Sequence, residues 1–399
     1  MFTIRSVPSS GDLLIYFSWA DAPRLQGLTS FAEYETNAIF IRDPGKSWYN
    51  GAIPGLSGNA NELLDLLRAH CAKFDLSRVT VAGTSMGGYA AILFGTLLGA
   101  GRVVAIGPQI VLDKNLPRSP SAPVKYSDLA PVIVGKHERT AIDIWYGFES
   151  ALDLYNALLV PQIDGVRTFG VRGAMHNVLA KFKRTNELRR FFSHIAIGTP
   201  FDVPVFHING DLRERILQAG ERFFVQKDYP GAISISTPIV EQISLSSVHF
   251  LIGASHFRMK DLELARQSFE RAASACDENY DAHHHLGLYF EKKGDFKAAE
   301  ASFARGLEYF DAPNGLRFSK LAASQFRNGK YQEAIANHQQ AISLDPSISR
   351  SHFELAMMYD RAGVGDRALH HFQVHAHLKP GFPTTERHIS RLMKVTAKR

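Results

Sequence analysis

The sequence predicts an α/β domain built on a parallel sheet, followed by an all-α domain of stacked helical hairpins. Short apolar strand patterns alternate with helix patterns over about residues 1–195, and small and aromatic residues recur every 34 or 35 residues near the end of the chain. With 399 residues, 45% of them hydrophobic, the chain is long enough for two or three domains. We therefore expect an α/β domain at 1–195, a connector at 196–245 and a repeat domain at 246–385.

Runs rich in branched and aromatic residues predict the strands of the first domain. They lie at 13–17, 38–42, 79–82, 103–106, 141–146 and 166–171. Helix patterns between them, such as 61–74 and 86–98, predict a parallel sheet that is covered on both faces. The Pro-rich stretch 108–140 is irregular, and we expect it to form a cap or loop beside the site.

The C-terminal part repeats one pattern four times. Ala265, Ala299, Ala334 and Ala368 are 34, 35 and 34 residues apart, and each is followed four residues later by an aromatic residue or histidine. A glycine stands five residues before each of the last three alanines. The small residue lets two helices approach, and the glycine turns the chain. Residues 246–383 therefore resemble tetratricopeptide repeats, a resemblance that implies a protein partner.

Composition excludes several classes of protein. The net charge of +6 is spread along the chain, which argues against a nucleic-acid interface. Cys71 and Cys276 are too few for a disulfide framework or a cysteine zinc site, and no apolar run reaches the length of a membrane span. No phosphate-loop or dinucleotide motif is present, and His371 and His375 lack further metal ligands. We expect a cytoplasmic protein without metal or cofactor.

One motif carries a chemical prediction. Gly83-Thr84-Ser85-Met86-Gly87 has the pattern G-x-S-x-G, directly after a strand pattern at 78–82 and directly before a helix pattern at 88–94. A nucleophile elbow needs this order of strand, tight turn and helix, with glycines that prevent clashes. Over about residues 1–195 the sequence thus resembles the α/β-hydrolase superfamily, which implies a serine esterase or acyltransferase with Ser85 as the nucleophile.

That resemblance requires an acid and a histidine later in the chain. His176 follows the strand pattern 166–171 and precedes a helix pattern at 178–191, where the family places its general base. His194, at the end of that helix, is the weaker candidate. After the strand at 141–146 come Glu149 and Asp153, either of which can orient the imidazole. We favour Asp153, because similar enzymes place the acid just before such a helix.

The oxyanion hole requires two backbone N–H groups. The resemblance assigns one to Met86, directly after the nucleophile, and the other to the loop after the strand at 13–17. That loop contains no HGG motif, which departs from lipase-like members. The second donor is therefore expected to be Ser18 or Trp19.

A cluster at 41–51 follows the second strand on the same sheet edge as Ser85. Its Asp43, Trp48 and Tyr49 suit an acylated glycan or another polyol ester, because aromatic rings stack on sugar faces and polar groups bind hydroxyls. The alternative is a loop with two packing aromatics. The cluster also resembles α/β-hydrolase-like proteins of bacterial surface-polysaccharide and accessory-secretion loci, which implies acyl transfer to or removal from glycans.

Two functions remain open from sequence. In the first, Ser85 forms an acyl-enzyme, water or an acceptor hydroxyl resolves it, and the repeats recruit a partner or substrate. In the second, the first domain is an inactive scaffold and the repeats bind a protein partner. Repeat surfaces often pair, so a homo-oligomer is also a candidate state.

Overall fold

The computed structural model describes residues 2–20, 22–310 and 314–396. The chain divides into two compact units. The first comprises Met1–Asp261 with Ser274–Cys276, and the second Leu262–Ala273 with Asp277–Arg399.

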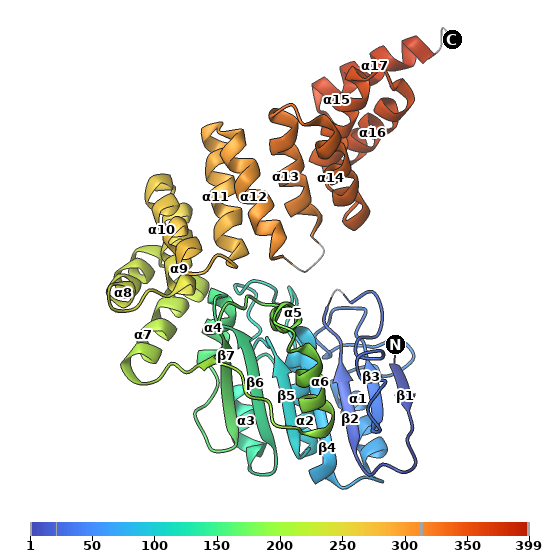
Figure 1. Cartoon of the computed structure of the whole chain (residues 1–399). Coiled ribbons are helices and arrows are strands. Elements are labelled where there is room, and N and C mark those ends of the chain that lie inside the picture. Colours follow the sequence, from blue (N-terminus) through green and yellow to red (C-terminus); the bar gives the residue numbers. More distant parts are fainter. Residues whose placement is uncertain (1, 21, 311–313, 397–399) are drawn as a thin grey trace. The chain divides into compact units, whose positions relative to one another are not determined.

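The first unit is built on an eight-stranded sheet in the order β1-β3-β2-β4-β5-β6-β7-β8 (Figure 1). Its strands are β1 (Phe2–Arg5), β2 (Leu13–Phe17), β3 (Asn37–Ile41), β4 (Val79–Thr84), β5 (Arg102–Ile106), β6 (Ala141–Gly147), β7 (Val166–Val171) and β8 (Val205–Phe206). The six central strands are parallel, but both edge strands pair antiparallel with their neighbours. The sheet is therefore mixed, and the expectation of a purely parallel sheet was wrong at both edges. The edge strand β1 has four mostly exposed residues, and the edge strand β8 has two half-buried ones, so neither shows a clear alternation of apolar and polar residues in the sequence.

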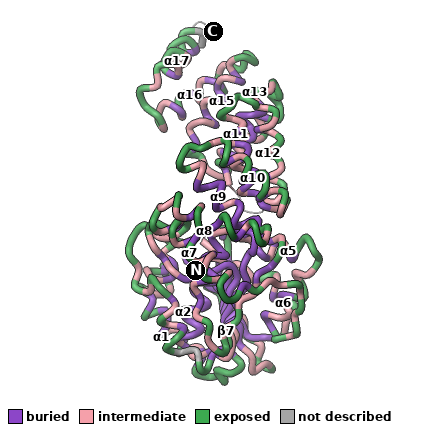
Figure 2. Tube along the Cα trace, turned by 90° about the vertical axis from the view of Figure 1, so that its left-hand side faces the viewer, coloured by how far each residue is buried: buried purple, intermediate pink, exposed green. Residues whose placement is uncertain are grey.

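Successive side chains of a strand point to opposite faces, and both faces of this sheet are buried. In β2, Leu13, Ile15 and Phe17 join one core, while Leu14 and Tyr16 join the other. The first core includes residues of α1 (Ala60–Cys71), α2 (Met86–Leu98) and α3 (Ala130–Lys136), and the second includes residues of α5 (Val178–Arg184) and α6 (Leu188–Ile197). The result is a three-layer arrangement, with buried residues concentrated along the strands (Figures 1 and 2).

The helix expected at 178–191 is two helices. α5 ends at Arg184 and α6 begins at Leu188. Asn186 lies between them with φ 62°, a left-handed conformation that an α-helix cannot contain. Apolar periodicity continues across the break, because Phe182 and Phe191 pack in the same core, and this explains why one long helix was expected.

Residues after the sheet add a helical layer to the same unit. It consists of α7 (Gly210–Gly220), the π-helix η3 (Glu221–Gln226), α8 (Tyr229–Gln242) and α9 (Ser246–Met259). Apolar residues of these helices pack against Leu154, Tyr155 and Leu158 of α4 (Ala151–Leu158). The segment expected to be a connector, 196–245, is thus largely folded onto the sheet domain, and α4 lies between that layer and the sheet.

The second unit consists of antiparallel helices. They are α10 (Leu262–Ala275), α11 (Tyr280–Lys293), α12 (Phe296–Glu308), α13 (Gly315–Arg327), α14 (Tyr331–Leu344), α15 (Ser349–Arg361), α16 (Gly365–Leu378) and α17 (Pro383–Thr396). All four recurring alanines are at most 1% exposed, and the residues four positions later are at most 2% exposed. Small and large residues therefore sit at the helix contacts, as the period predicted.

The turn before each recurring alanine has one conformation. Gly294, Gly329 and Gly363 have φ between 74° and 78°, in the left-handed region that glycine adopts most readily. The first copy has Lys260 at this position, and it takes φ 68°. The turn geometry is thus the same in all four copies, although the sequence signal is missing from the first.

His338 takes the position that phenylalanine holds in the other copies. It is fully buried, and its ring nitrogens lie 3.0 Å from Ser351 Oγ and 2.9 Å from Glu354 Oε2. Arg350 donates to Glu354 at 3.0 Å and to Glu291 at 2.7 Å. Polar contacts therefore connect α11, α14 and α15 within the repeats.

In the described ranges, no helix combines the length and the apolar character that crossing a bilayer requires.

Candidate active site

Ser85 lies at the turn between β4 and α2. Its φ of 57° and ψ of −118° are strained for a residue with a side chain, and its N–H donates to the Ile106 carbonyl at 2.7 Å. A Cβ at Gly87 would lie 2.1 Å from the Phe17 carbonyl oxygen, and one at Gly83 would lie 2.2 Å from the Gly87 oxygen. The glycines on either side of Ser85 therefore permit a close backbone approach that no other residue type allows.

The structure brings Ser85, His176 and Asp153 together. His176, in the loop between β7 and α5, has Nε2 at 3.0 Å from Ser85 Oγ. Its Nδ1 lies 2.9 Å and 3.0 Å from the two carboxylate oxygens of Asp153, in the first turn of α4. The His176 side chain is 21% exposed and that of Asp153 is 4% exposed. A carboxylate, an imidazole and a hydroxyl thus form one continuous hydrogen-bonded series.

Two further glycines allow the His176 loop to approach the sheet. A Cβ at Gly147, the last residue of β6, would lie 1.9 Å from the carbonyl oxygen of Met175. At Gly107, just after β5 and with φ 55°, a Cβ would meet the His176 ring at 3.4 Å. The position of the imidazole therefore depends on close contacts with the ends of two strands.

Glu149, the other candidate acid, has a different position. Its Oε1 accepts from the Gly173 N–H at 3.1 Å and lies 3.7 Å from Arg172 Nε. Gly173 belongs to the turn that leads to His176, so Glu149 holds this turn, while Asp153 contacts the imidazole. His194 bonds the Thr199 carbonyl instead, at 2.7 Å.

The three candidates for the oxyanion hole differ in what they already bond. The Ser18 N–H donates to the Ile41 carbonyl at 2.9 Å, so this donor is already used. Met86 begins α2, and the first N–H groups of a helix have no partner within the helix. Trp19 follows Ser18 at the end of β2, which pairs with β4. Trp19 therefore stays the predicted donor of this loop.

The residues predicted to bind substrate have structural positions instead. Asp43 is fully buried, and its carboxylate accepts from the N–H groups of Gly45, Ser47 and Tyr49 at 2.7–3.0 Å. Trp48 is 5% exposed and packs edge-on against Tyr89 of α2 at 5.5 Å. The prediction that Asp43, Trp48 and Tyr49 contact substrate was therefore wrong, since the Asp43 carboxylate also accepts from Ser47 Oγ at 2.9 Å and four donors leave it little capacity for a ligand.

Tyr49 has a specific role in this packing. It is fully buried, and its hydroxyl donates to the Ser18 carbonyl at 2.8 Å. Burial and the nearby charge of Asp43 raise the pKa of Tyr49 well above its ordinary value, so the phenol keeps its proton and remains a donor. The 41–51 cluster thus fixes the loop that contains the oxyanion candidates.

Sequence reasoning missed Arg118, which contacts the triad, and its neighbour in the same segment, Gln109. Arg118 Nη1 lies 3.5 Å from Asp153 Oδ1, and Gln109 is 4% exposed just after β5. Both belong to the irregular stretch expected beside the site. A Pro-rich segment has no periodicity, so nothing in the sequence indicated which of its residues face the triad.

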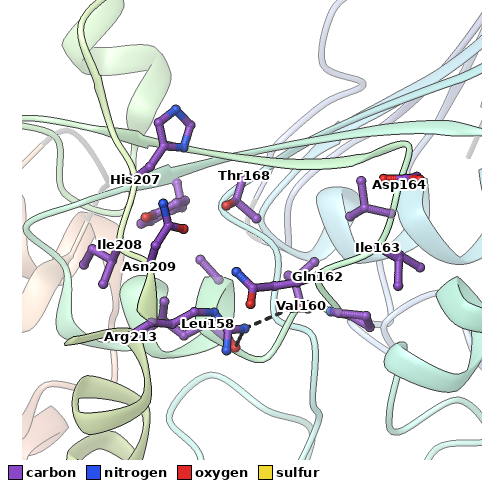
Figure 3. Close-up of a pocket in the computed structure, with 14 residues that line it drawn as sticks. Leu158, Val160, Gln162, Ile163, Asp164, Thr168, His207, Ile208, Asn209 and Arg213 are labelled. Atoms are coloured by element: carbon purple, nitrogen blue, oxygen red, sulfur yellow. Dashed lines mark hydrogen bonds between the residues drawn. The ribbon is translucent and has the colours of Figure 1, made fainter. Parts of the chain in front are cut away.

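A cavity of about 270 Å³ lies elsewhere on the sheet domain, where β6, β7 and α4 meet the segment around β8 (Figure 3). Gln162, His207 and Arg213 are among the residues that line it, and Arg213 donates to the Val160 carbonyl at 3.2 Å. Ser85, His176 and Asp153 are not part of its lining. This cavity is therefore separate from the candidate active site.

Comparison with known proteins identifies the C-terminal region. Residues 250–315 and 319–383 match the family described as tetratricopeptide repeat. The solved structures that match the chain include one titled "Crystal structure of MamA". Its sequence identity is 17%, the match covers 40% of this chain and 94% of the other, and the TM-score is 0.37. Another is titled "Crystal structure of YrrB: a TPR protein with an unusual peptide-binding site". Its sequence identity is 19%, the match covers 41% of this chain and 84% of the other, and the TM-score is 0.38.

The family match confirms the prediction of tetratricopeptide repeats at the C-terminus. These repeats imply binding to a protein partner. The match covers about a third of the chain and begins within α9, the last helix of the first unit.

Proposed function

We propose that the sheet domain is an α/β-hydrolase-like serine esterase or acyltransferase, and that the repeats recruit a protein partner or the substrate. The observation that carries the proposal is the series Ser85–His176–Asp153, with separations of 3.0 Å and 2.9 Å. Ser85 and His176 lie in turns after β4 and β7, Asp153 lies in the first turn of the helix after β6, and the strained Ser85 turn presents its hydroxyl to the imidazole.

The reaction follows from the contacts. Ser85 Oγ attacks the carbonyl carbon of an acyl ester while its proton passes to His176 Nε2. Asp153 accepts from Nδ1–H and stabilises the imidazolium. The N–H groups of Met86 and Trp19 stabilise the oxyanion, aided by the N-terminal dipole of α2. His176 then gives the proton to the departing alcohol, which leaves an acyl group on Ser85.

The second half of the reaction uses the same groups. Water or an acceptor hydroxyl gives its proton to His176 and attacks the acyl carbon. The tetrahedral intermediate collapses, and Ser85 Oγ leaves with the proton from His176. Water yields hydrolysis, and an acceptor hydroxyl yields acyl transfer. The burial of Asp43, Trp48 and Tyr49 removes the residues that suggested a glycan, so the proposal specifies an acyl ester alone.

Labelling with a fluorophosphonate probe tests the proposal. We expect an adduct on Ser85 of the wild-type chain, located by peptide mass, and none in Ser85→Ala. His176→Ala should label far more slowly, because the general base supplies about 10²–10⁴-fold. Ser121→Ala, which removes an exposed serine of the neighbouring segment, is the matched control and should label like wild type. Folding of each variant is checked by thermal unfolding.

The second candidate function is a scaffold in which the repeats bind a protein and Ser85 is inert. The family match favours it, because that match concerns the repeats and bears on no ester chemistry. Absence of any adduct on folded wild-type chain, in buffer and in cell lysate, would favour this candidate. Labelling of Ser85 that requires His176 would contradict it.

A further inference from the structure

Arg118 places a positive charge beside the triad. Its Nη1 lies 3.5 Å from Asp153 Oδ1, the same oxygen that lies 2.9 Å from His176 Nδ1. The Arg118 side chain is 39% exposed, while that of Asp153 is 4% exposed. The guanidinium therefore contacts the triad on one side and faces solvent on the other.

The segment that carries Arg118 is anchored on both sides of that residue. Leu116 is 3% exposed and packs with Leu152 and Tyr155 of α4. Ser119 Oγ accepts from Gln109 Nε2 at 3.0 Å. Arg118 itself has φ 67°, a conformation that few side-chain-bearing residues adopt. These contacts fix the backbone from which the guanidinium extends.

A neighbouring polar atom also lacks a partner. Gln109 Oε1 is buried and makes no hydrogen bond to any residue in the described part of the chain. Such an atom costs free energy unless a donor reaches it. This oxygen belongs to the same Gln109 side chain whose Nε2 donates to Ser119, and Ser119 directly follows Arg118 in the sequence. The segment thus places a cation next to the triad, with an unused acceptor on the residue that anchors Ser119.

Asp153 does not use the full capacity of Arg118. At 3.5 Å the contact is longer than a charge-assisted hydrogen bond, which measures about 2.7–2.9 Å. A guanidinium presents five donors in a planar fork, and this fork matches two oxygens of a carboxylate. The exposed part of the fork is therefore available to an anion that enters the site.

We propose that Arg118 binds an anionic group of the substrate, so that the site selects acyl esters that carry a carboxylate. The inference rests on the proposed function of Ser85. Arg118 is a specificity-determining residue here, and the reaction itself needs only the triad and the two N–H groups. The alternative role, neutralising Asp153 alone, would affect charged and neutral substrates equally.

The test compares two chromogenic esters of equal chain length. Mono-4-nitrophenyl glutarate carries a carboxylate, and 4-nitrophenyl valerate does not. In Arg118→Gln we expect the ratio of kcat/KM for glutarate over valerate to fall about 10- to 100-fold, the size expected for a hydrogen bond between charged groups. Arg118→Lys should recover part of this ratio. Lys114→Gln removes an exposed cation from the same segment and should keep the wild-type ratio.

A third ester locates the anion. The valeryl ester of 3-hydroxy-4-nitrobenzoate carries its carboxylate on the alcohol. A loss confined to glutarate places the recognised anion on the acyl half, and a loss confined to the benzoate places it on the alcohol half. An unchanged ratio for both, or equal losses for all three esters, would overturn the proposal.

Binding separates this inference from the proposed function. Titration of glutarate into Ser85→Ala and into the Ser85→Ala, Arg118→Gln double variant reports anion binding without turnover. We expect the double variant to bind at least about tenfold more weakly. Equal binding would refute the role of Arg118 even if Ser85 is an active nucleophile. If the double variant binds glutarate more weakly but the wild-type chain turns over no ester, the result would support anion binding by Arg118 and contradict the proposed role of Ser85 as nucleophile.

Discussion

Gly147→Ala tests whether the close contact at the end of β6 positions His176. The added Cβ would lie 1.9 Å from the Met175 oxygen and 2.3 Å from the Met175 carbonyl carbon. Ordinary contacts between heavy atoms are about 3.5 Å, so these groups must separate by more than about 1 Å. Met175 directly precedes His176, so the displacement passes to the imidazole. The alternative, displacement of β6, is opposed by its pairing on both sides with β5 and β7.

The expected losses follow from that displacement. A misplacement of about 1 Å in a catalytic constellation costs about 10²-fold in rate. Overpacking of a filled site costs about 1–3 kcal/mol of unfolding free energy. We therefore expect fluorophosphonate labelling of Ser85 to slow by about 100-fold, and the unfolding midpoint in urea to fall. Both quantities are measured on the full chain.

Gly135→Ala is the matched control for this substitution. Gly135 lies within α3, and a Cβ there would meet nothing within 4 Å. Alanine favours a helix over glycine by about 0.5–1 kcal/mol, so stability should rise slightly and labelling should keep the wild-type rate. Wild-type labelling by folded Gly147→Ala would refute the argument that this contact positions the imidazole.

Three further predictions concern the acid, the aromatic cluster and pH. Asp153→Asn should slow labelling far more than Glu149→Gln, because Asp153 bonds the imidazole, while Glu149 accepts from the Gly173 N–H. Tyr49→Phe should lower the free energy of unfolding in urea by about 1–3 kcal/mol, because the Ser18 carbonyl loses a buried donor. Burial lowers the pKa of His371 from 6.5 to about 4. Folding therefore loses stability as pH falls from about 6.5 to about 4, by about 1–2 kcal/mol once partial exposure is considered.

Each of these predictions has a control and a contrary outcome. Equal losses in Asp153→Asn and Glu149→Gln would mean that the acid is assigned wrongly. Tyr34→Phe, which removes an exposed hydrogen bond, should leave unfolding nearly unchanged, and a loss equal to that of Tyr49→Phe would contradict the burial argument. His371→Gln should flatten the pH dependence measured by thermal melts. An unchanged slope in that variant would assign it to other groups.

The sequence predicts the central strands of the sheet domain but not its two edge strands, β1 and β8. The predicted strands 13–17 and 166–171 coincide with β2, which is a short, fully buried apolar run, and with β7, which is buried only at its C-terminal end. β8 pairs two residues, and β1 is mostly exposed, so neither has a pattern to detect. The repeats were accessible from sequence because a period imposes the same contact on every copy.

The sequence indicates candidate site residues where a residue type must stand at a fixed place along the chain, but it does not indicate which side chains are buried. Ser85 and His176 stand at turns that follow strands, and turn position can be read from sequence. Trp48 and Tyr49 stand at such a turn as well, but their rings point into the core. Arg118 depends on the path of an irregular segment, which only tertiary contacts determine.

The ion pair between Arg350 and Glu291 has a consequence for how the repeats unfold. In most helical arrays each repeat contacts only its neighbours, so the ends can fray independently. Glu291 lies in α11, Arg350 in α15, and the whole α13–α14 hairpin lies between them in sequence. Separating α15 from the array thus also breaks a contact two hairpins away. Loss of structure in this array should accordingly be more cooperative than nearest-neighbour coupling allows, with α11 through α15 melting as one block.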